Sequence, residues 1–216
     1  MHNPIEKYER KDVFCFAGAY YKKYPDRAKD LENFTEKLPQ IRPLEIFDRN
    51  YGKNDPNYQF PPSYNKFIQG TLPFEQIDKA YKGYKYAINL NSIKQSQTMF
   101  ARRVLELLAS NTIVVSNFSR GVRQIFGDLI FCSDSGSEII RRLEETGADT
   151  TKLDRIRLAG LRKVMREHTY EHRLTYIMHK LSGRVPSLES PLFNVFCRVG
   201  SEKELQSIIA HINRQL

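Results

Sequence analysis

Short apolar segments alternate along this chain with longer segments in which apolar residues recur at helical spacing. The short segments are predicted to be strands, at 13–18, 44–48, 66–70, 84–91, 112–116 and 128–132. The longer segments are predicted to be helices, at 26–38, 73–83, 99–110, around Val122, at 139–145 and at 154–181. Strands that are buried on both faces appear as continuous apolar runs, and parallel strands need a crossover helix between them. The pattern therefore predicts an α/β fold in which helices flank a parallel sheet.

Two segments have neither periodicity. Residues 49–65 are rich in Gly, Asn, Pro and Tyr, which favours a long ordered loop. Residues 182–191 (SGRVPSLESP) contain Ser, Gly and Pro at positions that would break regular structure, so they are predicted to be a linker. A strand-like run and a helix follow in 192–216. We therefore expect one domain over 1–181, a linker over 182–191, and the start of a following domain in 192–216.

The charge balance narrows the class of partner. The formal net charge is +9, which favours nucleic acid, a phosphorylated small molecule or an anionic membrane surface, including peripheral membrane association. The sequence has no apolar run of the ~20 residues that a membrane-spanning helix needs. Its three cysteines are widely spaced, form no C-x-x-C pair and cannot all pair with one another, which is typical of a reducing compartment. We expect a cytoplasmic protein.

The helix predicted at 99–110 carries Glu106 on an otherwise apolar segment, RRVLELLAS. One interpretation is a solvated stripe in which Arg102 and Glu106 form an i, i+4 ion pair of about 0.3 kcal/mol. The other depends on position. The helix lies between two predicted buried strands, and ligands of open α/β sheets bind where strands end and the next helices begin. There a carboxylate can accept hydrogen bonds from a ribose diol, and an arginine can neutralise a pyrophosphate.

Several stretches resemble a known family. GTLPFEQIDKAYKGYKYAINLNS, RRVLELLASNTIVVSN, EHTYEHR and VFCFAGAYYKKYPDR are similar to the donor-binding half of GT-B glycosyltransferases. The closest group is the one similar to the spore maturation protein CgeB, with the pattern R-x-F-E-x-L-A-x-G. The resemblance covers 12–181 and implies a Rossmann-like sheet that forms one half of a GT-B fold. The tail, PLFNVFCRVGSEKELQSIIAHINRQ, resembles the start of a GT-A glycosyltransferase domain.

The resemblance implies roles for particular residues. Glu106 matches the glutamate that binds the ribose hydroxyls, and Arg103 matches the arginine one turn before it, which faces the diphosphate. The segment that reads the base edge is matched by Thr71 and Leu72. The remaining candidates are Gly18, in the first-strand loop that approaches phosphate, Arg27 as a further phosphate ligand, and Thr98.

Thr98 marks a departure from the family. Many related transferases carry a sugar-contacting glutamate at this position, so the identity of the sugar and the stereochemical outcome stay open. The family's glycine at the end of this helix is replaced by Asn111, which also tolerates a left-handed backbone.

The function implied is transfer of a glycosyl group from a nucleotide-diphosphate sugar, expected to be a UDP-sugar, to a cell-surface or spore polysaccharide acceptor. No metal and no cofactor is expected, and no catalytic residue can be named. GT-B enzymes bind the acceptor in another half, so this chain is expected to be a piece of a larger enzyme that is weakly active or inactive alone.

Three alternatives stay open. The first is a zinc protease, because HTYEH (168–172) matches H-x-x-E-H, but the surrounding basic residues oppose a bound cation and no third ligand is evident. The second is a nucleic-acid-binding module built on basic residues of the last long helix, although stacking aromatics are not interleaved with them and no nucleic acid is expected. These basic residues are Arg155, Arg157, Arg162, Lys163 and Arg166. The third is a non-catalytic nucleotide-binding or assembly domain.

Overall fold

The computed structural model describes residues 2–183 and 197–213. It divides into two compact units, the first ending at Arg173 and the second beginning at Leu174. Each unit is described by itself. The predicted linker lies mostly outside the described residues.

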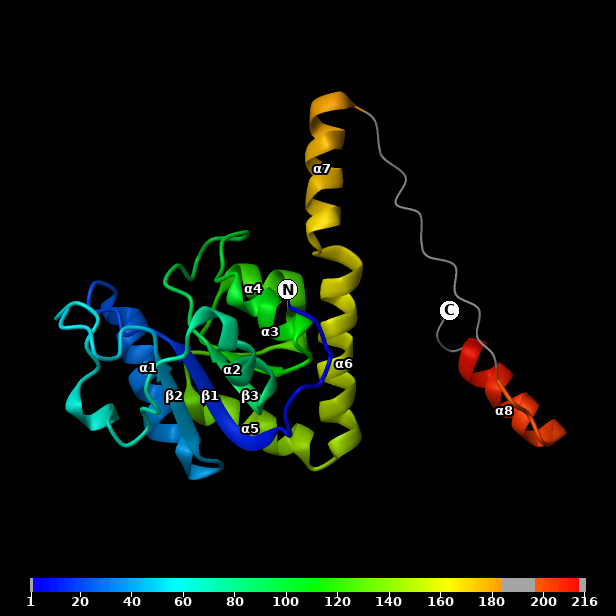
Figure 1. Cartoon of the computed structure of the whole chain (residues 1–216), viewed down its shortest axis with the longest axis horizontal. Coiled ribbons are helices and arrows are strands. Elements are labelled where there is room, and N and C mark those ends of the chain that lie inside the picture. Colours follow the sequence, from blue (N-terminus) through cyan, green and yellow to red (C-terminus); the bar gives the residue numbers. More distant parts are fainter. Residues whose placement is uncertain (1, 184–196, 214–216) are drawn as a thin grey trace. The chain divides into compact units, whose positions relative to one another are not determined.

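The first unit is built on a sheet of five parallel strands in the order β2-β1-β3-β4-β5 (Figure 1). The strands are β1 Lys11–Gly18, β2 Leu44–Asp48, β3 Tyr84–Asn89, β4 Ile113–Ser116 and β5 Phe131–Cys132. The chain steps from β1 to β2 on one side and then to β3 on the other side of β1. The predicted Rossmann-like α/β fold is therefore confirmed, and its topological switch point lies beside the end of β1.

Helices connect successive strands: α1 Pro25–Lys37, α2 Asp78–Lys82, α3 Arg103–Ala109 and α4 Arg120–Phe126. After β5 follow α5 Gly136–Gly147, α6 Thr150–Glu167 and α7 Tyr170–Ser182. Pro25 occupies the first helical position of α1, where its missing N–H costs nothing. Asn111, just after α3, has a φ of 57°, as its match to the family's glycine predicts.

Successive residues of a strand point into two separate hydrophobic cores, one on each face of the sheet. Phe14 and Phe16 of β1 point to the face that packs against α1 and α5. Cys15 and Ala17 point to the opposite face, with the apolar sides of α2, α3 and α6. Side chains alternate across a strand, so a sheet covered on both faces favours apolar residues at successive positions. This is why most of the strands can be located as apolar runs.

Several predicted elements differ from the structure. The helix predicted at 73–83 is a 3₁₀ turn, Phe74–Gln76, followed by the short helix α2, Asp78–Lys82. The segment predicted as a strand at 66–70 forms only an isolated bridge, Ile46 to Ile68, along the edge of β2. Helix α3 begins at Arg103 and not at 99, because Asn91 Oδ1 accepts a hydrogen bond from Ala101 N and holds the preceding chain in a loop. Strand β5 begins at 131 and not at 128, since 127–129 form a 3₁₀ turn.

A further difference is the helix predicted over 154–181, which is two helices. Helix α6 ends at Glu167, and α7 begins at Tyr170. Thr169 Oγ1 accepts a hydrogen bond from His172 N at 3.4 Å, which is the geometry of a helix N-cap. A capping threonine thus starts a new helix where the apolar pattern alone runs on.

A buried polar network fixes the start of α3. Asn117, at the end of β4, is fully buried and its amide nitrogen donates to Asp30 Oδ2 at 2.7 Å and to Asn91 O at 2.9 Å. Its amide oxygen accepts from Asn91 N at 2.7 Å. The side chain of Asn91 in turn accepts from Ala101 N at 2.8 Å. The ends of β3 and β4 are therefore tied to the residues that lead into α3.

The second unit contains α8, Glu202–Asn213, within the segment predicted as a helix. The strand-like run predicted before it lies outside the described residues up to 196, and residues 197–200 form neither helix nor strand. Among the described helices of the chain, none combines the length and the apolar character needed to cross a membrane.

Candidate functional site

A cavity of about 840 Å³ opens at the carboxyl ends of β1, β2 and β3, within the first unit. It is lined by Gly18 at the end of β1, Arg49 after β2, Leu90 after β3 and Glu106 from α3. This is the switch-point crevice at which open α/β sheets bind their ligands. Its volume lies within the range of roughly 300–1,000 Å³ that is typical of small-molecule sites.

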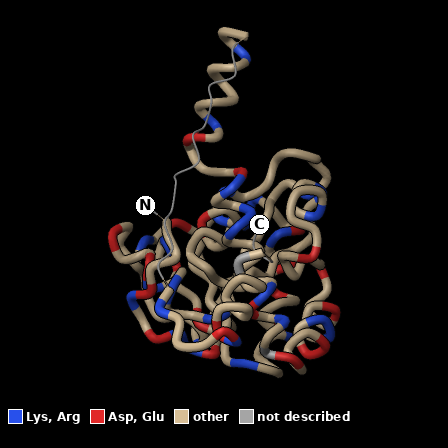
Figure 2. The backbone as a smooth tube through the Cα atoms, turned by 90° about the vertical axis from the view of Figure 1, so that its right-hand side faces the viewer, with Lys and Arg blue, Asp and Glu red and all other residues tan. Residues whose placement is uncertain are grey.

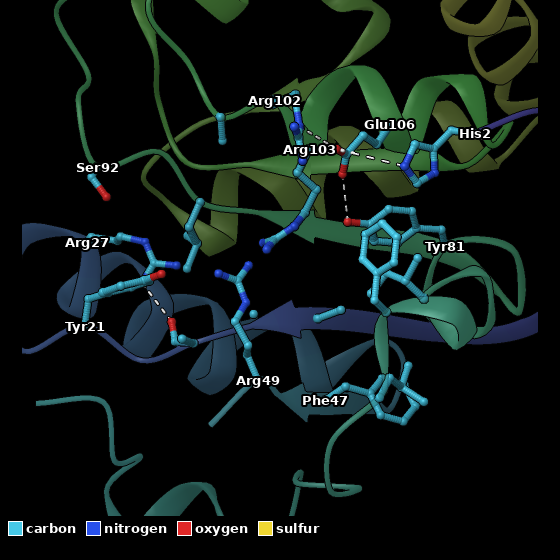
Figure 3. Close-up of a pocket in the computed structure, with 18 of the residues that line it drawn as sticks. His2, Tyr21, Arg27, Phe47, Arg49, Tyr81, Ser92, Arg102, Arg103 and Glu106 are labelled. Atoms are coloured by element: carbon cyan, nitrogen blue, oxygen red, sulfur yellow. Dashed lines mark hydrogen bonds and ion pairs between the residues drawn. The ribbon is translucent and has the colours of Figure 1, made fainter. Parts of the chain in front are cut away.

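Three arginines converge on the middle of this cavity: Arg27 from α1, Arg49 after β2 and Arg103 from α3 (Figure 3). Within 2–183 and 197–213, none of the three has a carboxylate oxygen within the ion-pair distance of 4.0 Å. Unpaired cations that face one another across a cavity repel. An anion with more than one negative charge would relieve this repulsion.

Arg27 is held in place although it is buried. Its Nη1 donates a hydrogen bond to Ala19 O at 3.1 Å, and its guanidinium lies over the ring of Tyr21, 4.6 Å from the ring centre. Burial, and after it the positive charge of Arg103, lower the pKa of Arg27 to about 10. The guanidinium is still charged at neutral pH. A bound anion would replace some of the solvation that this group has lost.

Arg103 lies above the end of β1. Its guanidinium carbon is 5.7 Å from the ring centre of Phe16, and its Nε is buried without a hydrogen-bond partner. A Cβ added at Gly18 would lie 3.2 Å from Arg103 Nη1 and 2.6 Å from Phe16 Cζ. Gly18 therefore leaves the space that Arg103 needs to reach the cavity.

Glu106 is at the opposite end of the cavity and already has neighbours. Its Oε1 accepts from Arg102 Nε at 2.7 Å, and its Oε2 accepts from Tyr81 Oη at 3.0 Å. His2 Nε2 lies 4.0 Å from Oε1, and burial lowers the pKa of this histidine. Each carboxylate oxygen has a second lone pair, so Glu106 can still accept hydrogen bonds from a diol. The Arg102 pair of the first interpretation forms, and the carboxylate also lines the cavity, while its binding of a ribose diol stays a prediction.

An apolar wall lies next to Glu106. It is formed by Phe47, Leu72, Ile77 and the ring of Tyr81, with the exposed Phe74 at the rim. Such a wall suits the flat face of an aromatic ring. The cavity thus has an apolar region beside a carboxylate and a cationic region beyond it.

The structure brings together five of the seven candidate residues. Glu106, Arg103, Leu72, Gly18 and Arg27 all line the cavity. The other two do not line it: Thr71 is exposed, and Thr98 is exposed in the loop before α3, where its amide donates to Ser96 Oγ. The roles of the seven residues stay predictions.

Sequence reasoning missed Arg49, Tyr81 and Tyr21. A signal for Arg49 exists, because it directly follows the strand LEIFD and so stands at a strand's carboxyl end. Nothing in the local sequence marks Tyr81 or Tyr21, since their place in the cavity follows from tertiary packing.

The H-x-x-E-H match is divided between two elements. His168 caps the end of α6, whereas His172 lies in α7 and pairs with Thr169 Oγ1 through its Nδ1 at 2.6 Å. The described residues contain no group of three or more His, Cys, Asp or Glu side chains that could hold a metal ion. The geometry gives the zinc-protease hypothesis no support.

The basic residues of α6 do not form a uniform patch. Arg157 pairs with Asp154 at 3.2 Å and Lys163 with Glu167 at 2.7 Å. In Figure 2, Lys and Arg positions are mixed with Asp and Glu positions along the backbone of the first unit. A surface that tracks nucleic acid needs basic residues gathered on one face, so this arrangement does not favour the nucleic-acid hypothesis.

A family model described as glycosyl transferase-like matches residues 26–179. The chain belongs to this glycosyl transferase-like family. The match includes the arginines, Glu106 and most of the other cavity residues. The finer resemblance to the CgeB-like group and the GT-A-like tail stay predictions.

Two solved structures show the same fold. One is the C-terminal domain of a glycosyl transferase group 1 family protein (LpcC) from Francisella tularensis, with 14% identity and a TM-score of 0.52, covering 78% of this chain and 96% of that one. The other is TarM, with 9% identity and a TM-score of 0.54, covering 84% of this chain and 37% of TarM. This glycosyl transferase-like chain therefore corresponds to about a third of TarM. A search of curated proteins finds no match.

Proposed function

We propose that this glycosyl transferase-like domain binds the nucleotide part of a nucleotide-diphosphate sugar and supports transfer of the sugar. The observation that carries the proposal is the arrangement within one cavity. Arg27, Arg49 and Arg103 line it without an acidic partner among the described residues, and Glu106 stands beside an apolar wall at one end. A nucleoside diphosphate offers groups that match each region in turn.

The arginines would take the diphosphate. Guanidinium groups bind phosphate oxygens with charge-assisted hydrogen bonds, and Arg103 Nε is a buried donor without a partner. When the glycosyl–oxygen bond of the donor breaks, negative charge grows on the leaving diphosphate. Cationic groups that are already in place stabilise that charge without further reorganisation.

The nucleoside would occupy the other end. Glu106 would accept hydrogen bonds from the two ribose hydroxyls, while Phe47 and Ile77 cover the base. Leu72 would lie beside the base edge, as the resemblance implies. The hydrogen bond from Tyr81 keeps Glu106 directed along the cavity.

The proposal extends to the donor, the acceptor and the rest of the enzyme. The donor would be a UDP-sugar, and the acceptor a cell-surface or spore polysaccharide that another domain binds. The whole enzyme would be longer than this chain, cytoplasmic and in peripheral contact with the membrane. Residues 192–216 would begin a further domain. The isolated chain would then hydrolyse or transfer its donor weakly or not at all.

The direct test is to titrate UDP, GDP and TDP against the chain by calorimetry and thermal shift, with UMP for comparison. We expect at least one diphosphate to raise the melting temperature and to bind about tenfold tighter than UMP, because one additional phosphate meets the arginines. Glu106→Ala should weaken the binding of the same diphosphate. The proposal fails if no diphosphate stabilises the wild type, or if the variant binds it unchanged.

A further inference from the structure

Beyond the arginines, the cavity has an aromatic end that the proposed position of the nucleotide leaves unoccupied. Tyr21 and Tyr24, which we call the tyrosine wall, both line the cavity. In Figure 3, Tyr21 and Arg27 lie on one side, Arg49 and Arg103 in the middle, and Tyr81 and Glu106 on the other side. Arg49 and Arg103 thus separate Tyr21, which packs against Tyr24, from Tyr81 and Glu106.

The long loop at 49–65 packs against the tyrosine wall and positions it before any ligand binds. Tyr58 packs edge-on against Tyr21, with the ring centres 5.3 Å apart, and Lys22 N donates to Asn57 O at 3.1 Å. Tyr21 in turn packs against Tyr24 at 6.2 Å and supports Arg27 through its face. This loop therefore holds one side of the cavity in place.

Tyr24 is 38% exposed. It precedes the first residue of α1, but its side chain makes no hydrogen bond that caps the helix. Ser92, on the side of the cavity where Arg27 lies, adds a hydroxyl (Figure 3). An aromatic face with a polar group nearby suits a ligand that has both apolar C–H surface and hydroxyls, which describes a sugar ring.

We infer that the tyrosine wall is the subsite for the sugar ring of the donor, with Tyr24 as its specificity-determining contact. This inference rests on the proposed function. A nucleotide sugar is linear, with base and ribose, diphosphate and sugar in that order. If ribose lies at Glu106 and the diphosphate at the arginines, the group beyond the diphosphate reaches Tyr21 and Tyr24. The order of regions along the cavity matches the order of groups along the ligand.

The test compares each nucleotide sugar with its own diphosphate. UDP-glucose, UDP-N-acetylglucosamine and GDP-mannose, together with UDP and GDP, are titrated by calorimetry against wild type, Tyr24→Ala and Tyr24→Phe. We expect Tyr24→Ala to lower the affinity for the nucleotide sugar about threefold to tenfold, while the affinity for the diphosphate changes less than about twofold. Tyr24→Phe keeps the ring and should bind both ligands as the wild type does.

Tyr8→Ala is the matched control, because Tyr8 is also 38% exposed and lies outside the cavity. This variant should change the affinity for neither ligand. If Tyr24→Ala weakens the binding of nucleotide sugar and diphosphate by the same factor, Tyr24 does not contact the sugar ring and the inference is overturned. It is also overturned if the affinity for neither ligand changes. If the wild type binds no diphosphate, the proposed function fails and this inference with it.

Discussion

Replacing Arg103 with methionine should weaken the binding of UDP, or of whichever diphosphate binds, by about tenfold to a hundredfold. Hydrogen bonds between charged groups contribute about 1.5–3 kcal/mol each, and 1.4 kcal/mol corresponds to a factor of ten. The fold should not suffer, because within the described part of the chain Arg103 has no acidic partner and its Nε is buried without a hydrogen bond. We therefore expect an unchanged or slightly raised melting temperature together with weaker binding, measured by thermal shift and calorimetry.

Arg162→Met is the matched control for this experiment. Arg162 is an exposed arginine of α6 that lies outside the cavity. It should leave both the affinity and the melting temperature unchanged. Binding by Arg103→Met within twofold of the wild type would show that the diphosphate is not held by this side chain.

The largest loss of stability should come from Asn117→Ala. The substitution removes the hydrogen bonds of a fully buried amide and leaves Asn91 N without its partner at 2.7 Å. Unsatisfied buried polar groups cost roughly 1–3 kcal/mol each, so we expect the free energy of unfolding to fall by about 3 kcal/mol. For a chain of this size, that corresponds to a drop in melting temperature of about 10 °C.

Asn57→Ala provides the comparison for the asparagine network. Asn57 is exposed and its side chain contacts only Asp55 among the described hydrogen bonds, so the change should cost less than about 0.5 kcal/mol. Denaturant unfolding monitored by circular dichroism measures both variants. Equal midpoints for Asn117→Ala and the wild type would mean that the network does not stabilise the fold.

The fold could be predicted well because its strands are buried on both faces. That burial makes most strand positions apolar, so runs such as 13–18 and 112–116 stand out without an alignment. The errors arose where side chains override the apolar pattern. Thr169 caps a new helix inside an apparently continuous one, and Asn91 delays the start of α3. Both are polar contacts of single residues, which periodicity does not detect.

The site was predicted in part. Glu106 and Arg103 were located by their place between two strands and by the resemblance to a family. Arg49 could have been found from the same rule about strand ends. The partnership of Glu106 with Tyr81 could not, because it joins α2 to α3 across 25 positions of sequence and depends on how these helices pack. Thr98 was placed by analogy, and the loop carries it away from the cavity wall.

The central claim is that Glu106 binds the ribose hydroxyls of a nucleotide, and it can be tested by removing those hydroxyls. UDP and 2′,3′-dideoxy-UDP are titrated by calorimetry against the wild type and Glu106→Ala, with GDP or TDP and their dideoxy forms if those bind better. Hydrogen bonds to a carboxylate should give the wild type a preference for the ribose form of about tenfold or more. The account predicts that this preference falls below about twofold in Glu106→Ala. The same preference in both proteins would contradict it.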